Sequence, residues 1–293
     1  MTPDFRMTPQ TTVIVQGIES QASRRWVASM RRYGTPIVGW VSASSEETES
    51  DGLPVFRSHA EALSATGAEV CVSMVPPRTA ADSLLEAADS GIRLIVSLTA
   101  GMPLHDAVRV RRRIADLHIT CVGPDSSGIA VPAAQVKLGT MPDEALAPGA
   151  VALVTTSDSL AAEAGYQMVQ RGLGQSLYVD VGSNMIKGTA MAALPALLQA
   201  DEATEAIALL GTTRGTEEED FAEAMRQAGL SKPVFAYIAG HTLPAGALGH
   251  FWPLLDGTAS IAAAARKRAA LEAAGAKVCN SLDALIKAVQ AAA

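Results

Sequence analysis

Short apolar runs alternate with longer amphipathic stretches along almost the whole chain. In the first 124 residues, the runs that predict β-strands lie at 12–15, 36–41, 70–75, 94–98 and 119–122. The stretches that predict helices lie at 21–33, 58–65, 79–90 and 104–117. Strands separated by helices cannot form hairpins, so this half predicts a mostly parallel, doubly wound sheet of Rossmann type.

The alternation stops at residues 123–149 and then begins again. This stretch holds four prolines and little periodicity, so we interpret 125–149 as a linker between a first domain at 1–124 and a second at 150–293. In the second half, strands are predicted at 150–155, 175–181, 206–210, 234–239 and 277–279. Helices are predicted at 159–171, 191–200, 216–228, 260–274 and 281–293. The pattern predicts a second α/β domain of flavodoxin-like type.

Composition narrows the classes of partner. The chain has 293 residues and is 48% hydrophobic, which is enough apolar material for two domain cores. Its net charge of −7 argues against nucleic acid, which requires a basic face. No apolar stretch reaches the roughly 18 residues of a membrane span and the N-terminus lacks an apolar signal region, so we expect no membrane partner and a cytoplasmic protein. Three widely spaced cysteines predict buried, reduced thiols and no metal site.

The loop after the strand predicted at 234–239 carries the first candidate for chemistry. This loop is rich in Gly and Pro, and His250 follows Gly249 within it. A rigid strand fixes the start of such a loop while the loop itself reaches a neighbouring site, which is why catalytic groups concentrate there. A histidine that is merely solvated or hydrogen-bonded is the alternative interpretation.

A second candidate lies at the predicted strand-to-helix turn that contains Ser157, Asp158 and Ser159. Backbone N–H groups and the helix dipole favour an anion at such a position, so the turn suits a phosphoryl group. The alternative is that Ser157 or Asp158 only caps the helix, and the charge of Asp158 would compete with a bound phosphate. A histidine that faced this turn would be suited to transient phosphorylation, with the dipole stabilising the negative charge.

Matching segments along some 260 residues show that the chain resembles the alpha subunit of succinyl-CoA synthetase and its relatives, the ADP-forming acid–CoA ligases. Among these segments are Gly52-Leu53-Pro54-Val55-Phe56, Leu138-Gly139-Thr140-Met141-Pro142, Gly172-Leu173-Gly174-Gln175-Ser176, Tyr237-Ile238-Ala239-Gly240, Gly249-His250 and Ala270-Leu271-Glu272-Ala273-Ala274-Gly275.

The resemblance implies a function and a set of site residues. It implies an N-terminal Rossmann-like domain that binds CoA through Gly17, Ser20, Gln21, Val75 and Pro76. It further implies that His250 carries phosphate, cradled by Gly249 and the turn at 157–159, between an acyl phosphate and a nucleotide. That nucleotide, ATP or GTP with Mg²⁺, would be bound by an ATP-grasp beta subunit, and the substrate would be a small carboxylic acid.

The departures from the family pattern are concentrated at the same places. Ser20 and Ser23 fill two positions where the family has glycine, and an acidic stretch at 44–51 replaces a lysine-bearing loop. Thr212 stands where the family has the glutamate that orients the phosphohistidine. Arg214, two residues later, is our candidate for pairing with the carboxylate of an altered substrate.

Two functions therefore stay open from the sequence. The first is an acid–CoA ligase with an altered acid, in which Thr212 and Arg214 contact the substrate. The second is a divergent subunit that binds CoA or an acyl group without forming phosphohistidine. The retained Gly249-His250 pair favours the first, and the loss of the glutamate at Thr212 favours the second.

Overall fold

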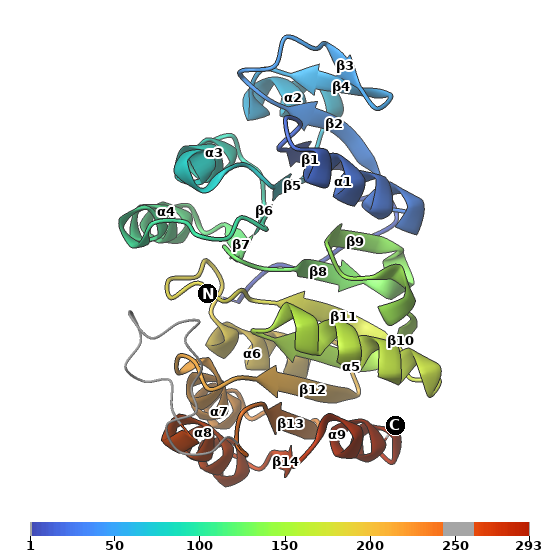
Figure 1. Ribbon diagram of the computed structural model, residues 1–293, viewed down its shortest axis with the longest axis vertical. Helices are drawn as coiled ribbons and strands as arrows, with labels where there is room; N and C mark the ends of the chain where they lie inside the picture. The colour runs from blue at the N-terminus through green and yellow to red at the C-terminus, as the bar shows by residue number, and fades with distance from the viewer. Residues whose placement is uncertain (1, 243–260, 293) are drawn as a thin grey trace.

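The computed structural model describes residues 2–242 and 261–292, which form two seven-stranded sheets flanked by helices (Figure 1). The first sheet has the order β3-β4-β2-β1-β5-β6-β7 and is parallel except for β3. Its strands are β1 (Val13–Gln16), β2 (Ile37–Val41), β3 (Glu49–Ser50), β4 (Leu53–Phe56), β5 (Val70–Ser73), β6 (Leu94–Ser97) and β7 (Thr120–Val122). The helices between them are α1 (Gln21–Tyr33), α2 (His59–Thr66), α3 (Pro77–Asp89) and α4 (Leu104–Leu117).

The second sheet has the order β14-β13-β12-β10-β11-β8-β9. Its strands are β8 (Gly128–Val131), β9 (Val136–Gly139), β10 (Pro148–Thr155), β11 (Gln175–Asp180), β12 (Ala206–Gly211), β13 (Val234–Ile238) and β14 (Lys277–Cys279). The helices are α5 (Asp158–Gln170), α6 (Leu194–Ala200), α7 (Glu217–Ala228), α8 (Ile261–Ala273) and α9 (Leu282–Gln290). Short 3₁₀ turns lie at Pro132–Ala134, Asp143–Ala145 and Met191–Ala193. The predicted α/β class with two parallel-rich sheets is confirmed.

Helix α1 shows how local signals set the elements that border the site. The Ser20 side chain accepts a hydrogen bond from the Ser23 backbone N–H at its N-terminus, and the helix ends at Gly34, whose φ of 123° suits glycine. Val27 and Met30 are buried on one face of the helix. The amphipathic spacing seen in the sequence therefore sets both the helix and the face that it packs on the sheet.

The stretch 125–149, which we predicted as a linker, instead contains β8 and β9. These strands pair with each other in antiparallel fashion, and β8 pairs with β11, so both belong to the second sheet. A Cβ atom on Gly128 would lie 2.0 Å from the Leu138 carbonyl oxygen, so the hairpin requires glycine at its close approach. The physical reason for the difference is that long-range pairing, and not local periodicity, makes these short strands. The domain boundaries themselves stay a prediction.

The largest hydrophobic core runs across both sheets. It includes Val13 and Val15 of β1 together with Val154 of β10 and Val179 of β11. Polar contacts join the same regions, because Thr35 Oγ1, just before β2, donates to the Lys137 carbonyl of β9 at 2.8 Å. The two sheets are therefore joined by shared packing as well as by the chain.

No helix among the described residues combines the length and the apolar character that crossing a bilayer would require.

Candidate active site

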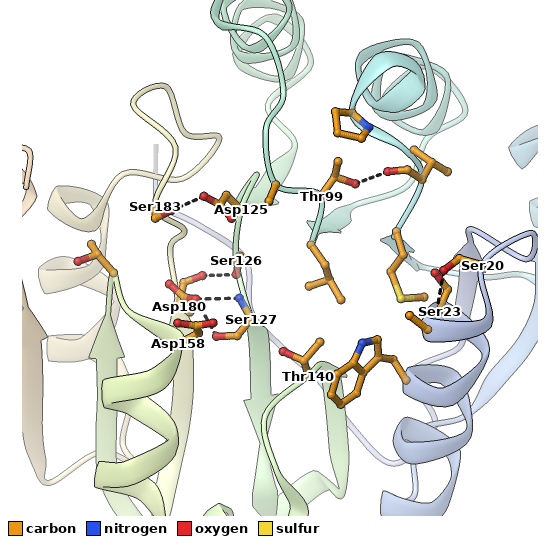
Figure 2. Close-up of a pocket in the computed structure, with 18 residues that line it drawn as sticks. Ser20, Ser23, Thr99, Asp125, Ser126, Ser127, Thr140, Asp158, Asp180 and Ser183 are labelled. Carbon is orange, nitrogen blue, oxygen red and sulfur yellow. Dashed lines mark hydrogen bonds between the residues drawn. The ribbon is translucent and has the colours of Figure 1, made fainter. Parts of the chain in front are cut away.

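A cleft of about 430 Å³ lies between the two sheets (Figure 2). Its first wall comes from the N-terminal part of the chain, where the turns after β1, β5 and β6 meet. Its second wall comes from the segment between β7 and β8, from the turn between β10 and α5, and from the end of β11. Ligands of doubly wound sheets bind past the carboxyl ends of the strands, and this cleft has that position in both sheets.

The first wall is formed by small polar and apolar groups. Gly17 has a φ of 106°, and a Cβ atom there would lie 2.7 Å from the Met74 carbonyl oxygen, so this glycine serves the close packing of the β1 turn on the segment after β5. Ser20 and Ser23 line the cleft beside it, with Trp26 one turn further along α1. Because Ser20 and Ser23 carry hydroxyl groups, this wall presents side-chain donors to a ligand.

Arg24, on the helix that borders the first wall, is already paired with other groups of the protein. Arg24 donates to the Ile18 carbonyl oxygen at 2.8 Å and forms ion pairs with Glu47 and Asp51, both at 3.1 Å. The acidic stretch at 44–51 therefore draws this arginine onto its own loop. Arg24 therefore has a structural role at this loop.

The turn between β10 and α5 differs from a simple helix cap. Ser157 is the first residue before α5, yet its side chain forms no capping hydrogen bond. Its N–H instead donates to Thr155 Oγ1 at 2.8 Å. Asp158 Oδ1 accepts the Ser159 N–H at 2.6 Å and the Ser159 hydroxyl at 3.0 Å. A phosphoryl oxygen at this turn would therefore compete with the Asp158 carboxylate for the same donor.

Asp180, at the end of β11, is a cleft residue that the sequence reasoning missed. The Ser127 N–H and hydroxyl both donate to Asp180 Oδ2 at 2.7 Å, and the Gly182 N–H donates to Oδ1 at 2.9 Å. The Tyr178 hydroxyl lies 2.5 Å from the Ser127 hydroxyl and completes the network. Figure 2 shows Ser126, Ser127, Asp158 and Asp180 gathered on one side of the cleft.

Burial raises the pKa of Asp180 to about 6, although the hydrogen bonds from Ser127 and Gly182 oppose this shift. The charge of nearby Asp158 adds to the rise in the pKa. The signal in the sequence was a single carboxylate at the end of an apolar run. Its partner Ser127 is 53 residues away along the chain, which is why the pattern alone did not reveal the pair.

Thr212 and Arg214 lie on a loop after β12, and the buried ion pair of Glu218 and Lys267 binds the backbone of this loop. Glu218 Oε2 and Lys267 Nζ lie 2.5 Å apart, and both side chains are almost completely buried. Glu218 Oε1 accepts the Thr212 N–H at 3.1 Å, and Lys267 donates to the Thr212 carbonyl at 2.8 Å and to the Arg214 carbonyl. The pair satisfies its own charges and fixes the backbone of the loop.

The cleft brings together only part of the predicted site. Ser20, Val75 and Asp158 line it. Arg214 does not line the cleft, but its guanidinium donates to the carbonyl oxygen of the lining residue Ser183 at 3.4 Å. The other predicted residues that do not line the cleft are Gly17, Gln21, Pro76, Ser157, Ser159 and Thr212. Gly249 and His250 lie outside the described residues.

Two families match the chain in succession. Residues 8–101 match the CoA binding domain, and residues 148–292 match the succinyl-CoA ligase like flavodoxin domain. The first match contains the turn of Ser20 and the second contains Asp158 and Asp180. The first wall of the cleft therefore lies within the first match, and the part of the second wall that follows β10 and β11 lies within the second match. The lining residues at 125–127 and 140 lie between the two matches.

Several relatives are similar over nearly their full length. The alpha 2 subunit of the ADP-forming succinate–CoA ligase of Archaeoglobus fulgidus is 38% identical over 92% of this chain and 92% of its own. A subunit of the ADP-forming sulfoacetate-CoA ligase of Bilophila wadsworthia is 34% identical over 94% of this chain and 96% of its own. The alpha subunit of the malate–CoA ligase of Methylorubrum extorquens is 35% identical over 87% of each.

A solved structure shares the fold. ATP citrate lyase from Methanosaeta concilii, in complex with (3S)-citryl-CoA, superposes with a TM-score of 0.83 at 22% identity, covering 97% of this chain and 50% of that chain. This chain thus spans about half the length of that enzyme. The relatives and the two matched domains agree in order and extent, and the chain belongs to the succinate–CoA ligase alpha-subunit family, with a CoA-binding domain followed by a flavodoxin-like ligase domain.

Proposed function

We propose that the chain is the alpha-type subunit of an NDP-forming ligase that joins a small carboxylic acid to the thiol of CoA. The observation that carries the proposal is the cleft, which sets Ser20 and Val75 of the CoA-binding domain against Asp158 of the ligase domain. Reactants that are held on opposite walls of one cleft gain the proximity that a two-substrate condensation needs.

The first wall is the proposed binding surface for CoA. Its hydroxyl groups on Ser20 and Ser23 supply donors, and Met74, Val75 and Leu98 supply apolar contact. Thr99 Oγ1 donates to the Val75 carbonyl at 2.7 Å, which fixes the two strand ends relative to each other. Gly17, Gln21 and Pro76 support this wall in the proposal without lining the cleft.

The phosphoryl group is proposed to travel on His250. In this scheme its imidazole nitrogen takes the terminal phosphoryl group of the nucleotide and passes it to the carboxylate of the acid. The thiol sulfur of CoA then attacks the acyl carbon, the C–O bond to phosphate breaks, and inorganic phosphate leaves. Gly249 and the N–H groups at 157–159 would stabilise the negative charge, with Asp158 moving aside from the Ser159 N–H.

A partner subunit completes the proposed enzyme. The similar relatives are named as subunits of ligases, which supports a second chain here as well. We propose that this partner is an ATP-grasp beta subunit that holds ATP or GTP with Mg²⁺. The nucleotide and Mg²⁺ would supply the activated phosphoryl group.

One observation favours a second function, in which the chain binds CoA or an acyl group without forming phosphohistidine. Thr212 offers no carboxylate to orient an imidazole ring, and the nearby carboxylate of Glu218 is neutralised by Lys267. Outer carboxylates around histidine ligands are worth about 10–100-fold in related settings. Both functions use the same cleft, and they differ in whether a phosphohistidine forms.

The substitution His250→Asn separates the two functions. With the partner subunit and labelled ATP, the parent chain should acquire an acid-labile, base-stable phosphate, and the variant should acquire none. Thr212→Glu should speed the labelling by about tenfold, because it restores a carboxylate at that position.

A matched control is His105→Asn, because His105 is highly exposed on α4 and does not line the cleft. This variant should label like the parent. Equal labelling of the parent and His250→Asn would remove the phosphohistidine step and favour the second function.

A further inference from the structure

A second, smaller pocket of about 270 Å³ lies away from the cleft. It is lined by the last turns of α4, by the residues just before β7, and by the segment between β11 and α6. Ile119, just before β7, lines this pocket, whereas Asp125, just after the strand, lines the cleft, and no residue lines both. Pockets for drug-sized molecules have volumes of roughly 300–1,000 Å³, so this pocket suits a smaller ligand.

An arginine and a histidine line the pocket, and none of its described lining residues is acidic. Arg111 Nη1 donates to the Lys187 carbonyl oxygen at 2.6 Å, while Nε and Nη2 have no partner among the described residues. The ring of His118, at the end of α4, also forms no hydrogen bond or ion pair within the described part of the chain. The guanidinium is therefore held through one nitrogen and keeps N–H donors for an anion.

The third polar group of the pocket is a hydroxyl without a partner. Thr189 lines the pocket and is only 7% exposed, yet its Oγ1 takes part in no hydrogen bond among the described residues. Nearly all buried polar groups have a partner, so an unpaired hydroxyl at the wall of a cavity points to a ligand. The Thr189 hydroxyl is not sealed from solvent, unlike that of Thr156, so a ligand in the pocket can supply the missing partner.

The acidic groups next to the pocket are paired with other cations. Asp4 follows a lining proline in the sequence, and its carboxylate lies 2.8 Å from the Arg6 guanidinium. Glu217 forms an ion pair with Lys187 at 3.1 Å. Neither carboxylate lines the pocket, so neither competes there for the N–H groups of Arg111.

We propose that this pocket is a second binding site, which takes a small carboxylate with a short apolar body. Arg111 and Thr189 bind the carboxylate oxygens, and His118 is a further donor. Much of the remaining lining is apolar, including Ile114 and Ile119, and such walls favour an apolar body over the additional charged oxygens of a phosphate. The inference goes beyond the proposed ligase function and does not depend on it.

Calorimetric titration of the full chain with hexanoate tests the chemistry of the ligand. We expect hexanoate to bind at least about tenfold more tightly than hexanamide, which has the same shape without the charge. It should also bind more tightly than inorganic phosphate, which has the charge without an apolar body. Equal binding of the amide, tighter binding of phosphate, or no binding of hexanoate at millimolar concentration would each overturn the inference.

Two substitutions test whether hexanoate binds in this pocket. Thr189→Val keeps the shape of the side chain and removes only its hydroxyl, and Arg111→Gln removes the charge. Each should weaken hexanoate binding by at least about tenfold, because each removes a hydrogen bond to a charged group. Thr189→Val alone decides the matter if Arg111→Gln does not fold.

Arg112→Gln is the matched control. Arg112 is the next residue of α4, is exposed and does not line the pocket, so this variant should bind hexanoate like the parent. Unchanged affinity in Thr189→Val would mean that hexanoate binds elsewhere, the cleft included, and would overturn the inference. Equal weakening in the control would overturn it as well, because the effect would then come from the charge of the helix and not from the pocket.

Discussion

Two buried polar networks in this protein have similar parts and opposite surroundings. In the first sheet, His59 Nε2 lies 3.6 Å from the Cys71 sulfur, and Nδ1 lies 3.1 Å from Glu86 Oε1. In the second sheet, Asp180 accepts from Ser127, whose hydroxyl contacts Tyr178. The first has the order of nucleophile, base and acid that is familiar from hydrolases, and the second does not.

Access decides between the two networks. His59, the first residue of α2, and Cys71 of β5 are fully buried, and neither lines the cleft between the two sheets. Burial also raises the pKa of the Cys71 thiol and lowers the pKa of His59, so neither group is in a reactive state. Asp180 and Ser127 are as deeply buried, but both line the cleft. The network of His59 has a catalytic arrangement but no route for a substrate, so we assign it to packing. The network of Asp180 lies beside a cavity, so we place the functional hypothesis there.

The largest expected effect comes from Asp180→Ala. The substitution leaves two N–H groups and a hydroxyl without their acceptor, so we expect the free energy of unfolding to fall by about 2–3 kcal/mol and thioester formation to fall with it. Glu86→Ala, in the network of His59 and Cys71, removes a carboxylate that is about half exposed (47%). It should lower the free energy of unfolding by less than about 1 kcal/mol, with activity retained. Urea unfolding of both variants measures the contrast, and equal losses would remove the distinction.

The next effect is a difference in the sign of the pH dependence. The pKa of Asp180 is raised on folding, so the folded state binds the extra proton and its stability falls as pH rises from about 4 to 6. Between pH 5 and pH 7.5 this amounts to a loss of about 1 kcal/mol, which Asp180→Asn should abolish. The pKa of His59 is lowered on folding, so its contribution has the opposite sign and stability is lost as pH falls below about 6.5.

Unfolding free energies of the parent, Asp180→Asn and His59→Gln at a series of pH values separate the two contributions. A slope of the same sign from both sites would contradict the assignment of their buried states.

An effect on stability alone, with none on activity, is expected for Cys71→Ala. The loss of one sulfur from a packed core should lower the free energy of unfolding by about 1 kcal/mol and leave thioester formation unchanged. In the native chain, a thiol reagent should react slowly with all three cysteines, because Cys71, Cys121 and Cys279 are all buried. Rapid labelling of Cys71, or loss of activity in the alanine variant, would mean that the network of His59, Cys71 and Glu86 has a functional role.

The elements that could be predicted are those whose boundaries are marked locally. Helix α1 begins and ends at the predicted residues because Ser20 caps it and Gly34 ends it, and α4 was predicted to the residue as well. The strands β8 and β9 were missed because their pairing partners lie elsewhere in the chain. Local chemistry fixes a cap, whereas a hairpin of four-residue strands depends on what lies opposite it.

In the candidate site, too, residues marked by the local sequence could be predicted, and residues brought together by the fold could not. Ser20 and Val75, which were predicted from the family resemblance, and Asp158, which was predicted from its strand-to-helix turn, all line the cleft, and their roles there stay predictions. Asp180 could not be predicted, because only the fold brings Ser127 to it. Arg214 donates to the Ser183 backbone carbonyl, a contact that no spacing along the chain would reveal, and its pairing with a substrate carboxylate stays a prediction.

The hydrophobic core shared by β1 and β10 has a consequence for motion. A hinge that closed the cleft would have to disturb a hydrophobic core that includes residues of both sheets, and close-packed interiors resist such rearrangement. The two walls should therefore keep a constant separation through the catalytic cycle, and capture of substrate falls to loops and to the partner chain. The cleft would then keep a fixed width, and that width would limit the size of the molecule that it can hold.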